Sequence, residues 1–447
     1  MISETPGSRS ALLPGRIRKR APGEEPGPRS PLRRAGAPLP RPLTANIAVA
    51  IVPCPESPGA ASSWKVPRLE SRRLHLAFGA FYFAQFAVLG IYIPYFPLYL
   101  KSLLLSGPEI GILLALAPVS RFLFPAFWGL WADRVGHRRL VVVLSLAGSA
   151  AAFALFFGAR HFVALGAVMF LYGFLMVPAI PLVEGLVQEE AEKRGFEYGR
   201  VRLWGSIGFI SLALTFGRLL DVAPIRTILA GILGISVLNI LPALAIPEGA
   251  PPGSHPHRSL RRELRRWSVL GFLSATALMQ ASHGAYYAYY SIHLDRIGFT
   301  RTAIGGFWTL AVAAEVLMML ASGWLQERIA APRLLSVCLA AATLRWLILA
   351  GSSSLPPLLL AQVLHAFSFG LFHVAAVGHT HRLFPPALRS SGQSLYSSLT
   401  YGLGNLLGLF GSAALVDRIG IPGLFGASAA VSLLAFFLSL RLLRDPA

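Results

Sequence analysis

The chain has 447 residues, of which 54% are hydrophobic and 13% are charged, and its formal net charge is +20 at pH 7. This balance excludes an ordinary soluble fold, because a water-exposed surface needs more charge, and it indicates a lipid environment. The excess of arginine does not indicate nucleic acid as a partner, since these residues lie in an N-terminal tail and between apolar runs, where they orient membrane proteins.

The first segment, residues 1–70, is rich in proline, arginine, glycine, alanine and serine and has no apolar period. Such a composition buries too little apolar surface to fold, so we expect a disordered basic tail. Its apolar stretch 46–54 is too short to span a membrane and follows too long a polar segment for a signal peptide. The alternative is that translation starts nearer the first apolar run.

Twelve apolar runs follow the tail, each of about 20 residues or more, which is the length that crosses a hydrocarbon core about 30 Å thick. They are 74–100, 108–132, 139–159, 162–188, 199–220, 224–246, 268–294, 302–326, 332–351, 355–383, 389–416 and 420–443. Backbone groups must pair within each span in lipid, and the runs lack the strict alternation of barrel strands. We therefore predict an all-α polytopic membrane protein with 12 transmembrane helices.

Basic residues between the runs set the predicted orientation, because lysine and arginine are retained on the cytoplasmic side. They concentrate after the even-numbered runs: Arg134, Arg138 and Arg139; Lys193, Arg194 and Arg200; Arg258, Arg261, Arg262, Arg265 and Arg266; Arg328 and Arg333; Arg382 and Arg389; Arg441 and Arg444. Both termini are thus predicted to be cytoplasmic, in a multi-pass protein of the cell inner membrane.

A Pro-, Gly- and Arg-rich segment, 247–267, follows the sixth run and is predicted to be a cytoplasmic linker. It separates an N-terminal bundle of six helices, 72–246, from a C-terminal bundle of six, 268–445. The sequence GLWADRVGHRR at 129–139 is weakly mirrored by GWLQERIAAPR at 323–333. This offset of about 190 residues is expected for a duplicated six-helix unit, so we predict two pseudo-symmetric bundles.

The segment GLWADRVGHRR also resembles the G-x-x-x-D-R-x-G-R-R signature of the major facilitator superfamily, which lies between helices two and three, with His137 in place of the first basic residue. The glycine permits close helix approach, and the aspartate can accept hydrogen bonds at the end of a neighbouring helix. The resemblance implies a latch that breaks when the transporter changes the side to which it opens. Its residues are Gly129, Asp133, Arg134, Gly136 and Arg138. Ordinary positive-inside charge is the alternative for Arg138.

Three further segments, 181–210, 280–320 and 344–376, look like the corresponding stretches of bacterial 3-phenylpropionate permeases. Those proteins belong with the lactose and nucleoside proton symporters in one branch of the superfamily. The resemblance covers 72–445, and YGRVRLWGS at 198–206 is its most specific string. It implies a proton-coupled transporter without a cofactor.

Ionisable residues inside apolar runs are costly in lipid and are expected to face a partner or a water-filled path. In the N-terminal half these are Arg121, Glu184 and Arg202. A planar guanidinium can hold a carboxylate through two hydrogen bonds, so Arg121 or Arg202 is predicted to bind an anionic substrate, with Glu184 available to pair with the arginine. A static Glu184–Arg202 pair is the alternative.

In the C-terminal half, Glu315, Arg345, His365 and His373 lie within the eighth, ninth and tenth runs and are predicted to couple transport to protons. A carboxylic acid in apolar surroundings favours its protonated form, a nearby arginine favours the ionised form, and histidine can relay the proton. The set is similar to the proton-binding constellation of the lactose permease branch, although the tenth run has no second carboxylate. Either histidine could instead bond a neighbouring carbonyl.

The seventh run contains HGAYYAYYSIHL at 283–294, whose four tyrosines cannot all face one side of a helix. His283, Tyr286, Tyr287 and Tyr290 are candidate substrate contacts, because phenol rings can stack on an aromatic substrate. Packing and an interfacial aromatic belt are the alternative for each tyrosine. No metal site is expected, since the chain has no HExxH motif.

The leading hypothesis is a proton symporter that imports a small organic solute, such as the aromatic monocarboxylate phenylpropionate, by rocking two bundles around a midplane site. Its partners would be the solute, protons and the bilayer, and we expect a monomer. A sugar or nucleoside symporter or a drug exporter is the alternative, and a neutral solute is favoured if Arg121 and Arg202 are each locked to a carboxylate. A membrane-embedded enzyme or receptor is a remote third reading, since the chain lacks a nucleophile elbow and a metal-ligand set.

Overall fold

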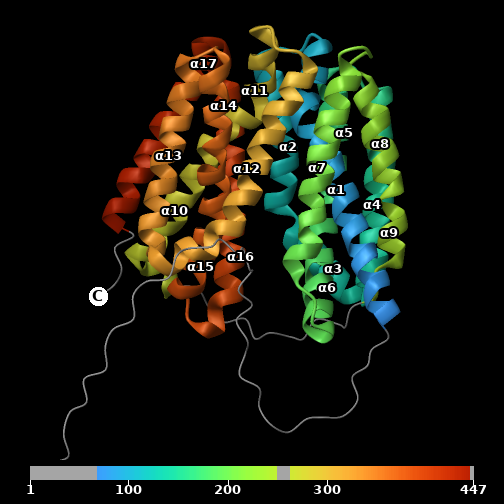
Figure 1. Cartoon of the computed structure of the whole chain (residues 1–447). Coiled ribbons are helices and arrows are strands. Elements are labelled where there is room, and N and C mark those ends of the chain that lie inside the picture. The colour runs from blue at the N-terminus through green and yellow to red at the C-terminus, as the bar shows by residue number, and fades with distance from the viewer. Residues whose placement is uncertain (1–67, 249–261, 443–447) are drawn as a thin grey trace, which may run out of the picture. The chain divides into compact units, whose positions relative to one another are not determined.

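A computed structural model describes residues 68–248 and 262–442, and nearly all of these residues are helical (Figure 1). The chain divides into two units, Met1–Ser63 and Trp64–Ala447. The first unit lies outside the described residues, as do most of the predicted tail and the middle of the predicted linker, so those two predictions are untested.

The first half of the described chain contains six spans, several of them made of two consecutive helices. They are α1 (Arg68–Ser102), α2 (Gly107–Leu123) with α3 (Pro125–Val135), α4 (Arg138–Ala154) with η1 (Leu155–Phe157), α5 (Phe162–Met176) with α6 (Ala179–Arg194), α7 (Tyr198–Leu220), and α8 (Thr227–Leu238) with α9 (Ile240–Ala245). Ser106 and Glu109 form a capping box that starts α2. Because proline cannot donate a helical hydrogen bond, the chain bends by 53° where α3 begins at Pro125.

The second half also contains six spans. After η2 (Glu263–Arg265) come α10 (Trp267–Ser282) with α11 (Gly284–Arg296), α12 (Arg301–Arg328), α13 (Ala331–Gly351), α14 (Leu355–Val363) with η3 (Ala366–Leu371) and α15 (Phe372–Leu383), η4 (Pro386–Leu388), α16 (Arg389–Ser397) with η5 (Ser398–Gly404), and α17 (Asn405–Leu442). Here η3 and η5 are π-helical segments. Two spans meet inside α17 at Gly420, whose φ of 67° is left-handed.

Nine helices in the described ranges are long and apolar enough to cross a membrane, or ten if α2 and α3 form one bent span. This number is smaller than the predicted twelve spans for two physical reasons. A break at His283 divides the seventh span into helices of 16 and 13 residues, each too short to qualify alone. The segment Ser391–Arg441 is taken as one helix but holds two spans across the Gly420 bend. The predicted all-α fold with twelve spans is confirmed.

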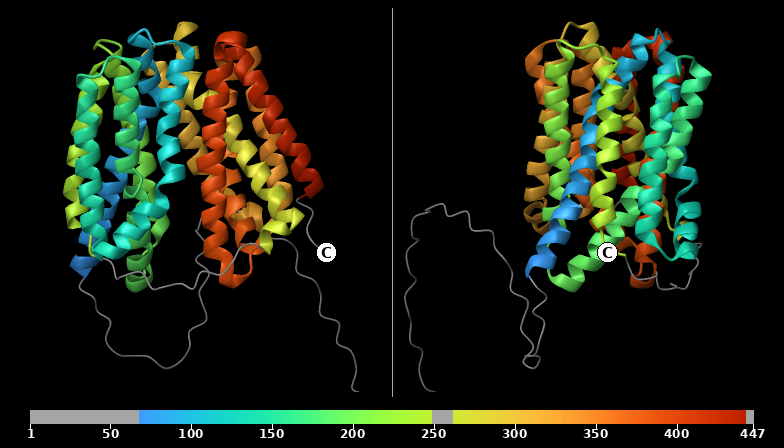
Figure 2. Two further views of the ribbon diagram at one scale, coloured as in Figure 1. Left: turned by 180° about the vertical axis from the view of Figure 1, so that it is seen from behind. Right: turned by 90° about the vertical axis from the view of Figure 1, so that its right-hand side faces the viewer.

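Close helix contacts recur at equivalent places in the two halves. A Cβ on Gly208 of α7 would collide with the backbone carbonyl of Phe83 on α1, and a Cβ on Gly408 of α17 would collide with that of Ala281 on α10. The first and fifth spans of each half therefore touch through their backbones, which is expected of a duplicated unit. Viewed from behind, the two halves form separate groups of helices (Figure 2).

The apolar core is shared by the two halves at one end and divided at the other. The largest cluster includes Leu100, Ile110, Tyr289 and Val416, and thus residues of both halves. At the end that carries the basic junctions, one cluster around Val187 belongs to the first half and another around Leu335 to the second. The structure is therefore closed at the end opposite the basic junctions and divided at the basic end.

Candidate functional site

Glu315 and His365 form the closest acid–histidine contact in the described parts of the second half. Glu315 lies on α12 and His365 between α14 and η3, and His365 Nε2 is 3.7 Å from Glu315 Oε2. The two side chains are only 17% and 6% exposed. Gly370 of η3 packs so closely that a Cβ there would lie 3.0 Å from Glu315 Cγ. This pair can hold a proton between an acid and an imidazole in a low-dielectric setting.

Arg345 is completely buried on α13, yet no carboxylate of residues 68–248 or 262–442 forms a salt bridge with it. Its Nε donates a hydrogen bond to the carbonyl of Ala361 (2.9 Å), and its guanidinium lies over the rings of Tyr286 (4.1 Å) and Trp346 (4.3 Å). In this conformation Arg345 therefore makes no direct contact with Glu315, on which it was expected to act. Arg345 is thus a cation held in place by one backbone carbonyl and by the faces of two aromatic rings.

His373 belongs to a separate contact on the same transmembrane span. Its Nδ1 is 2.6 Å from the hydroxyl of Tyr401 on η5, and that hydroxyl is 3.3 Å from the hydroxyl of Tyr396. His373 is only partly buried, unlike His365. The structure thus assigns the two predicted histidines different neighbours, with His365 beside the acid and His373 beside phenols.

The aromatic set of the seventh span is mostly hidden. Tyr286 and Tyr290 are fully buried, and their hydroxyls form hydrogen bonds with the side chain of Gln362. His283 is also buried, with its Nδ1 2.9 Å from the carbonyl oxygen of Met279. Tyr287 is half-buried and stacks on Trp308 at 6.5 Å. Of the four predicted substrate contacts on this span, Tyr287 alone presents part of its surface in this conformation.

Glu184 and Arg202 lie near each other in the first half, on α6 and α7. Glu184 Oε1 is 4.0 Å from Arg202 Nε, which is longer than a hydrogen bond, and the Tyr198 hydroxyl donates to the same oxygen at 3.4 Å. The guanidinium lies over the ring of Phe86 at 4.0 Å. Both charged side chains remain about one-third exposed, at 35% and 33%. The two side chains are therefore loosely paired, and each could exchange the other for a different partner.

Arg121 on α2 is the exposed cation of the predicted set. Its charge lies close to the hydroxyls of Tyr92 and Tyr172, on α1 and α5. No carboxylate in the described ranges forms a salt bridge with it. An exposed guanidinium offers two parallel donors to a carboxylate, and nearby tyrosines can contact the aromatic part of such a substrate.

The N-terminal and C-terminal residue sets approach each other where α7 packs on α12. Arg202 of α7 lies near enough to Glu315 and His373 for its charge to act on both. Four spans, α7, α12, α13 and the one made of α14, η3 and α15, therefore contribute one carboxylate, two histidines and two arginines to this region of the molecule. In the described part of the chain, no three His, Cys, Asp or Glu side chains gather as a metal site would require.

The signature segment is arranged differently from the expected latch. Gly136, with φ of 70°, ends α3, and Arg138 pairs with Glu189, which ties α4 to α6. Asp133 is exposed. A Cβ on Gly129 would meet nothing within 4 Å, so the close helix approach expected there is absent in this structure. The reason is that this end of the molecule is the one at which the two halves are divided.

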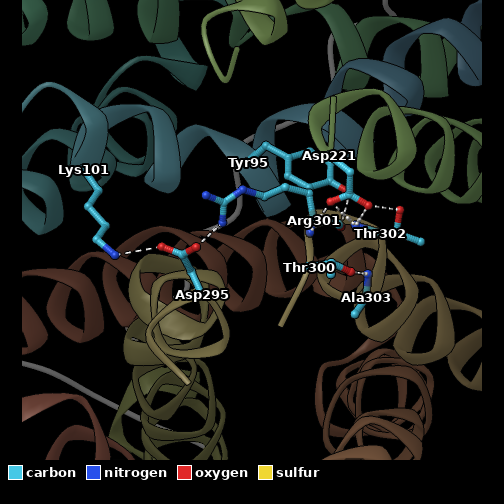
Figure 3. A network of polar contacts seen from close by, with 8 residues as sticks. All are labelled: Tyr95, Lys101, Asp221, Asp295, Thr300, Arg301, Thr302 and Ala303. Carbon is cyan, nitrogen blue, oxygen red and sulfur yellow. Dashed lines mark hydrogen bonds and ion pairs between the residues drawn. The ribbon is translucent and has the colours of Figure 1, made fainter. Parts of the chain in front are cut away.

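Charged residues near 295–301 are not among the candidate site residues predicted above. Figure 3 shows that they join the two halves. Lys101 Nζ of α1 lies 2.8 Å from Asp295 Oδ2, and Arg301 also pairs with Asp295. Asp221, which follows α7, accepts hydrogen bonds from the backbone N–H of Arg301 (2.8 Å) and from the Thr302 hydroxyl (2.5 Å). Acidic residues in otherwise weakly charged junctions were the available signal. We name these five residues the closing network.

Replacing Asp295 by Asn should loosen the closed end. Ion pairs of this exposure contribute about 0.2–1 kcal/mol each, so losing both pairs should raise the open population roughly fivefold. The measurement is the rate of maleimide labelling of an Ile292→Cys reporter in detergent, in a Cys54→Ser background, because Ile292 is 2% exposed and lines a pocket beside Lys101. Asp417→Asn, in the same pocket but outside the network, is the control. Equal labelling of the two variants would contradict this role.

Comparison with known proteins relates most of the described region to membrane transporters. The profile of the MFS_1 like family matches residues 75–427. The chain is 31% identical over 374 residues to a probable 3-phenylpropionic acid transporter of Escherichia coli K12, covering 80% of this chain and 95% of that protein. It is 29% identical over 357 residues to the maltose permease of Geobacillus stearothermophilus, covering 77% and 87%.

Solved structures show the same architecture. The crystal structure of the nucleoside transporter NupG superposes with a TM-score of 0.74 at 18% identity, covering 83% of this chain and 100% of that one. At this identity the likeness concerns the fold and not the cargo. The twelve spans of the present chain thus follow an arrangement known from transporters.

Proposed function

Because this chain belongs to the MFS_1 like family and is a multi-pass secondary transporter of a small molecule, we propose that it is a proton symporter that imports an aromatic monocarboxylate such as phenylpropionate. The observation that carries the proposal is the Glu315–His365 contact, an acid and an imidazole 3.7 Å apart in a nearly dry setting. A carboxyl group there can alternate between protonated and ionised states as its surroundings change, which is what coupling to a proton gradient requires.

The choice of an anionic cargo rests on Arg121. This exposed guanidinium pairs with no carboxylate of the described ranges and lies close enough to the hydroxyls of Tyr92 and Tyr172 to interact with them electrostatically. A substrate with a carboxylate and an aromatic ring satisfies both features, through paired hydrogen bonds and ring contacts. The similarity to a probable 3-phenylpropionic acid transporter supports the same class.

The proposed orientation places the basic junctions in the cytoplasm of a cell whose inner membrane holds the protein. The closing network then lies on the outer side, and the divided end opens inward. In this view bundles 72–246 and 268–445 rock as units about the linker 247–267, and a single chain suffices for transport. Gly129, Asp133 and Arg134 would engage a neighbour when the inner end closes.

Reconstituted vesicles test the proposal. With an inward proton gradient, radiolabelled phenylpropionate should accumulate, and a protonophore should remove the accumulation while leaving downhill uptake. One proton per substrate and one pH unit of gradient would give about tenfold accumulation, because each 1.4 kcal/mol corresponds to a factor of ten. Uptake that is unchanged when the gradient is collapsed would rule out proton coupling.

A neutral solute is the second candidate, and the Glu184–Arg202 pair favours it, since a cation already neutralised by a carboxylate has less need of an anionic cargo. The maltose permease relative carries a sugar by its name. Competition in the same vesicles separates the two: excess phenylpropionate should block uptake of the labelled acid, whereas maltose and a nucleoside should not. Inhibition by either neutral solute alone would favour the second candidate.

A further inference from the structure

Gln362 is a fully buried amide on the last turn of α14 to which no role has been assigned above. Its Oε1 accepts a hydrogen bond from the Tyr286 hydroxyl at 2.8 Å, and its Nε2 donates one to the Tyr290 hydroxyl at 2.7 Å. One amide therefore fixes two phenols of α11 at once, and each bond uses a different end of the amide.

The same turn of α14 also holds the buried cation. Tyr286, which bonds Gln362, places its ring 4.1 Å below the Arg345 guanidinium. Ala361, the residue before Gln362, accepts the hydrogen bond from Arg345 Nε. Because α14 ends at Val363 and the π-helical segment η3 begins at Ala366, carbonyls of this turn are available to a side chain.

His365 lies three residues after Gln362, on the same side of the helix, and contacts Glu315. The end of α14 thus connects the fixed cation with the acid–histidine pair. Other titratable or charged groups act on this pair from the packed elements: His283, Tyr286, Tyr287, Arg345, Tyr401 and Arg202. Among these, Arg345 is the cation whose position depends on Tyr286 and hence on Gln362.

We propose that Gln362 is a positioning residue: by clamping Tyr286 and Tyr290 it fixes the charge of Arg345 relative to the Glu315–His365 pair and thereby sets the pH range of transport. The inference rests on the proposed proton coupling through Glu315. The physical reason is that the field of a buried charge falls with distance: the Arg345 guanidinium acts on His365, so releasing it from its aromatic seat would make it oppose protonation of the Glu315–His365 pair less.

The test compares Gln362→Leu with Gln85→Leu in pH profiles of substrate counterflow, which needs no gradient. Gln85 is a matched control, since it is also a buried amide, 2% exposed, whose Oε1 accepts from Asn239 at 3.0 Å in the other half. Gln362→Leu should move the alkaline midpoint of counterflow upward by about one pH unit. At fixed pH this is a tenfold change in the ratio of protonated to deprotonated carrier. Gln85→Leu should leave the midpoint in place.

Two milder variants keep the test decisive if Gln362→Leu does not fold. Tyr290→Phe removes only the acceptor of the Gln362 Nε2 and should shift the midpoint in the same direction by less. Adding Gln362→Asn, the second milder variant, to Tyr286→Phe should add nothing to the shift of Tyr286→Phe alone, because Gln362 acts through that phenol.

Unshifted profiles in Gln362→Leu and Tyr290→Phe, with losses of maximal rate or thermal stability like those of Gln85→Leu, would overturn the inference and leave Gln362 a packing residue. The proposed function fails separately, in wild-type vesicles, if accumulation there ignores the proton gradient. A wild type that accumulates substrate and a Gln362 variant with the wild-type midpoint would refute the positioning role alone.

Discussion

Replacing Glu315 by Gln should abolish accumulation against a gradient in reconstituted vesicles, while counterflow of substrate should persist in part. Glutamine has the shape of the protonated acid but cannot release a proton, so the carrier can still exchange substrate but cannot take energy from the proton gradient. Accumulation at one pH unit of inward gradient should fall from about tenfold to about onefold. The measurement is the steady-state ratio of internal to external substrate.

Glu327→Gln is the matched control for this substitution. Glu327 lies on the same helix, α12, but is exposed near its end. The same chemical change there should leave accumulation near the wild-type level. Full accumulation in Glu315→Gln would remove Glu315 from the coupling mechanism, and equal losses in both variants would point to a general effect on the helix.

Replacing Arg121 by Gln should weaken binding of aromatic carboxylates roughly 10- to 150-fold, because hydrogen bonds to a charged group contribute about 1.5–3 kcal/mol. Arg121→Lys should recover part of the affinity, since it keeps the charge but loses the paired geometry. Binding to purified protein by isothermal titration calorimetry, with phenylpropionate and its neutral amide as ligands, measures the effect. The amide should bind the wild type and Arg121→Gln with similar, weak affinity.

Arg218→Gln controls for the loss of a positive charge, because Arg218 is an exposed arginine at the far end of α7. It should bind phenylpropionate like the wild type. If Arg121→Gln weakened the acid and the amide equally, Arg121 would be shaping the site and not holding the carboxylate. Unchanged affinity for the acid would move the anion site elsewhere, with Arg202 as the next cation to test.

The two sets of charges explain why the divided end matters for transport. The pair of Glu184 and Arg202 in the first half faces Glu315 and His373 across the packing of α7 on α12. Under the proposed coupling, motion of one half against the other would change the separation of these charges and so link conformation to protonation. The closing network holds the opposite end together meanwhile.

The amino-acid sequence by itself determined the all-α fold, the duplicated plan and the identity of the buried charges. Span length, loop charge and polarity are local properties that govern how each segment inserts into the membrane. They can therefore be predicted without tertiary contacts. Even the break at His283 and the bend at Gly420 leave the pattern of apolar runs intact.

Only the tertiary structure decided which of those charges meet. It placed His365, and not Arg345, beside Glu315, seated Arg345 on Ala361 and Tyr286, and left Gly129 without a neighbour. It also gave Gln362 and the closing network their partners. The physical reason is that such contacts depend on the rotation and tilt of helices far apart in the chain, which apolar periodicity alone does not fix.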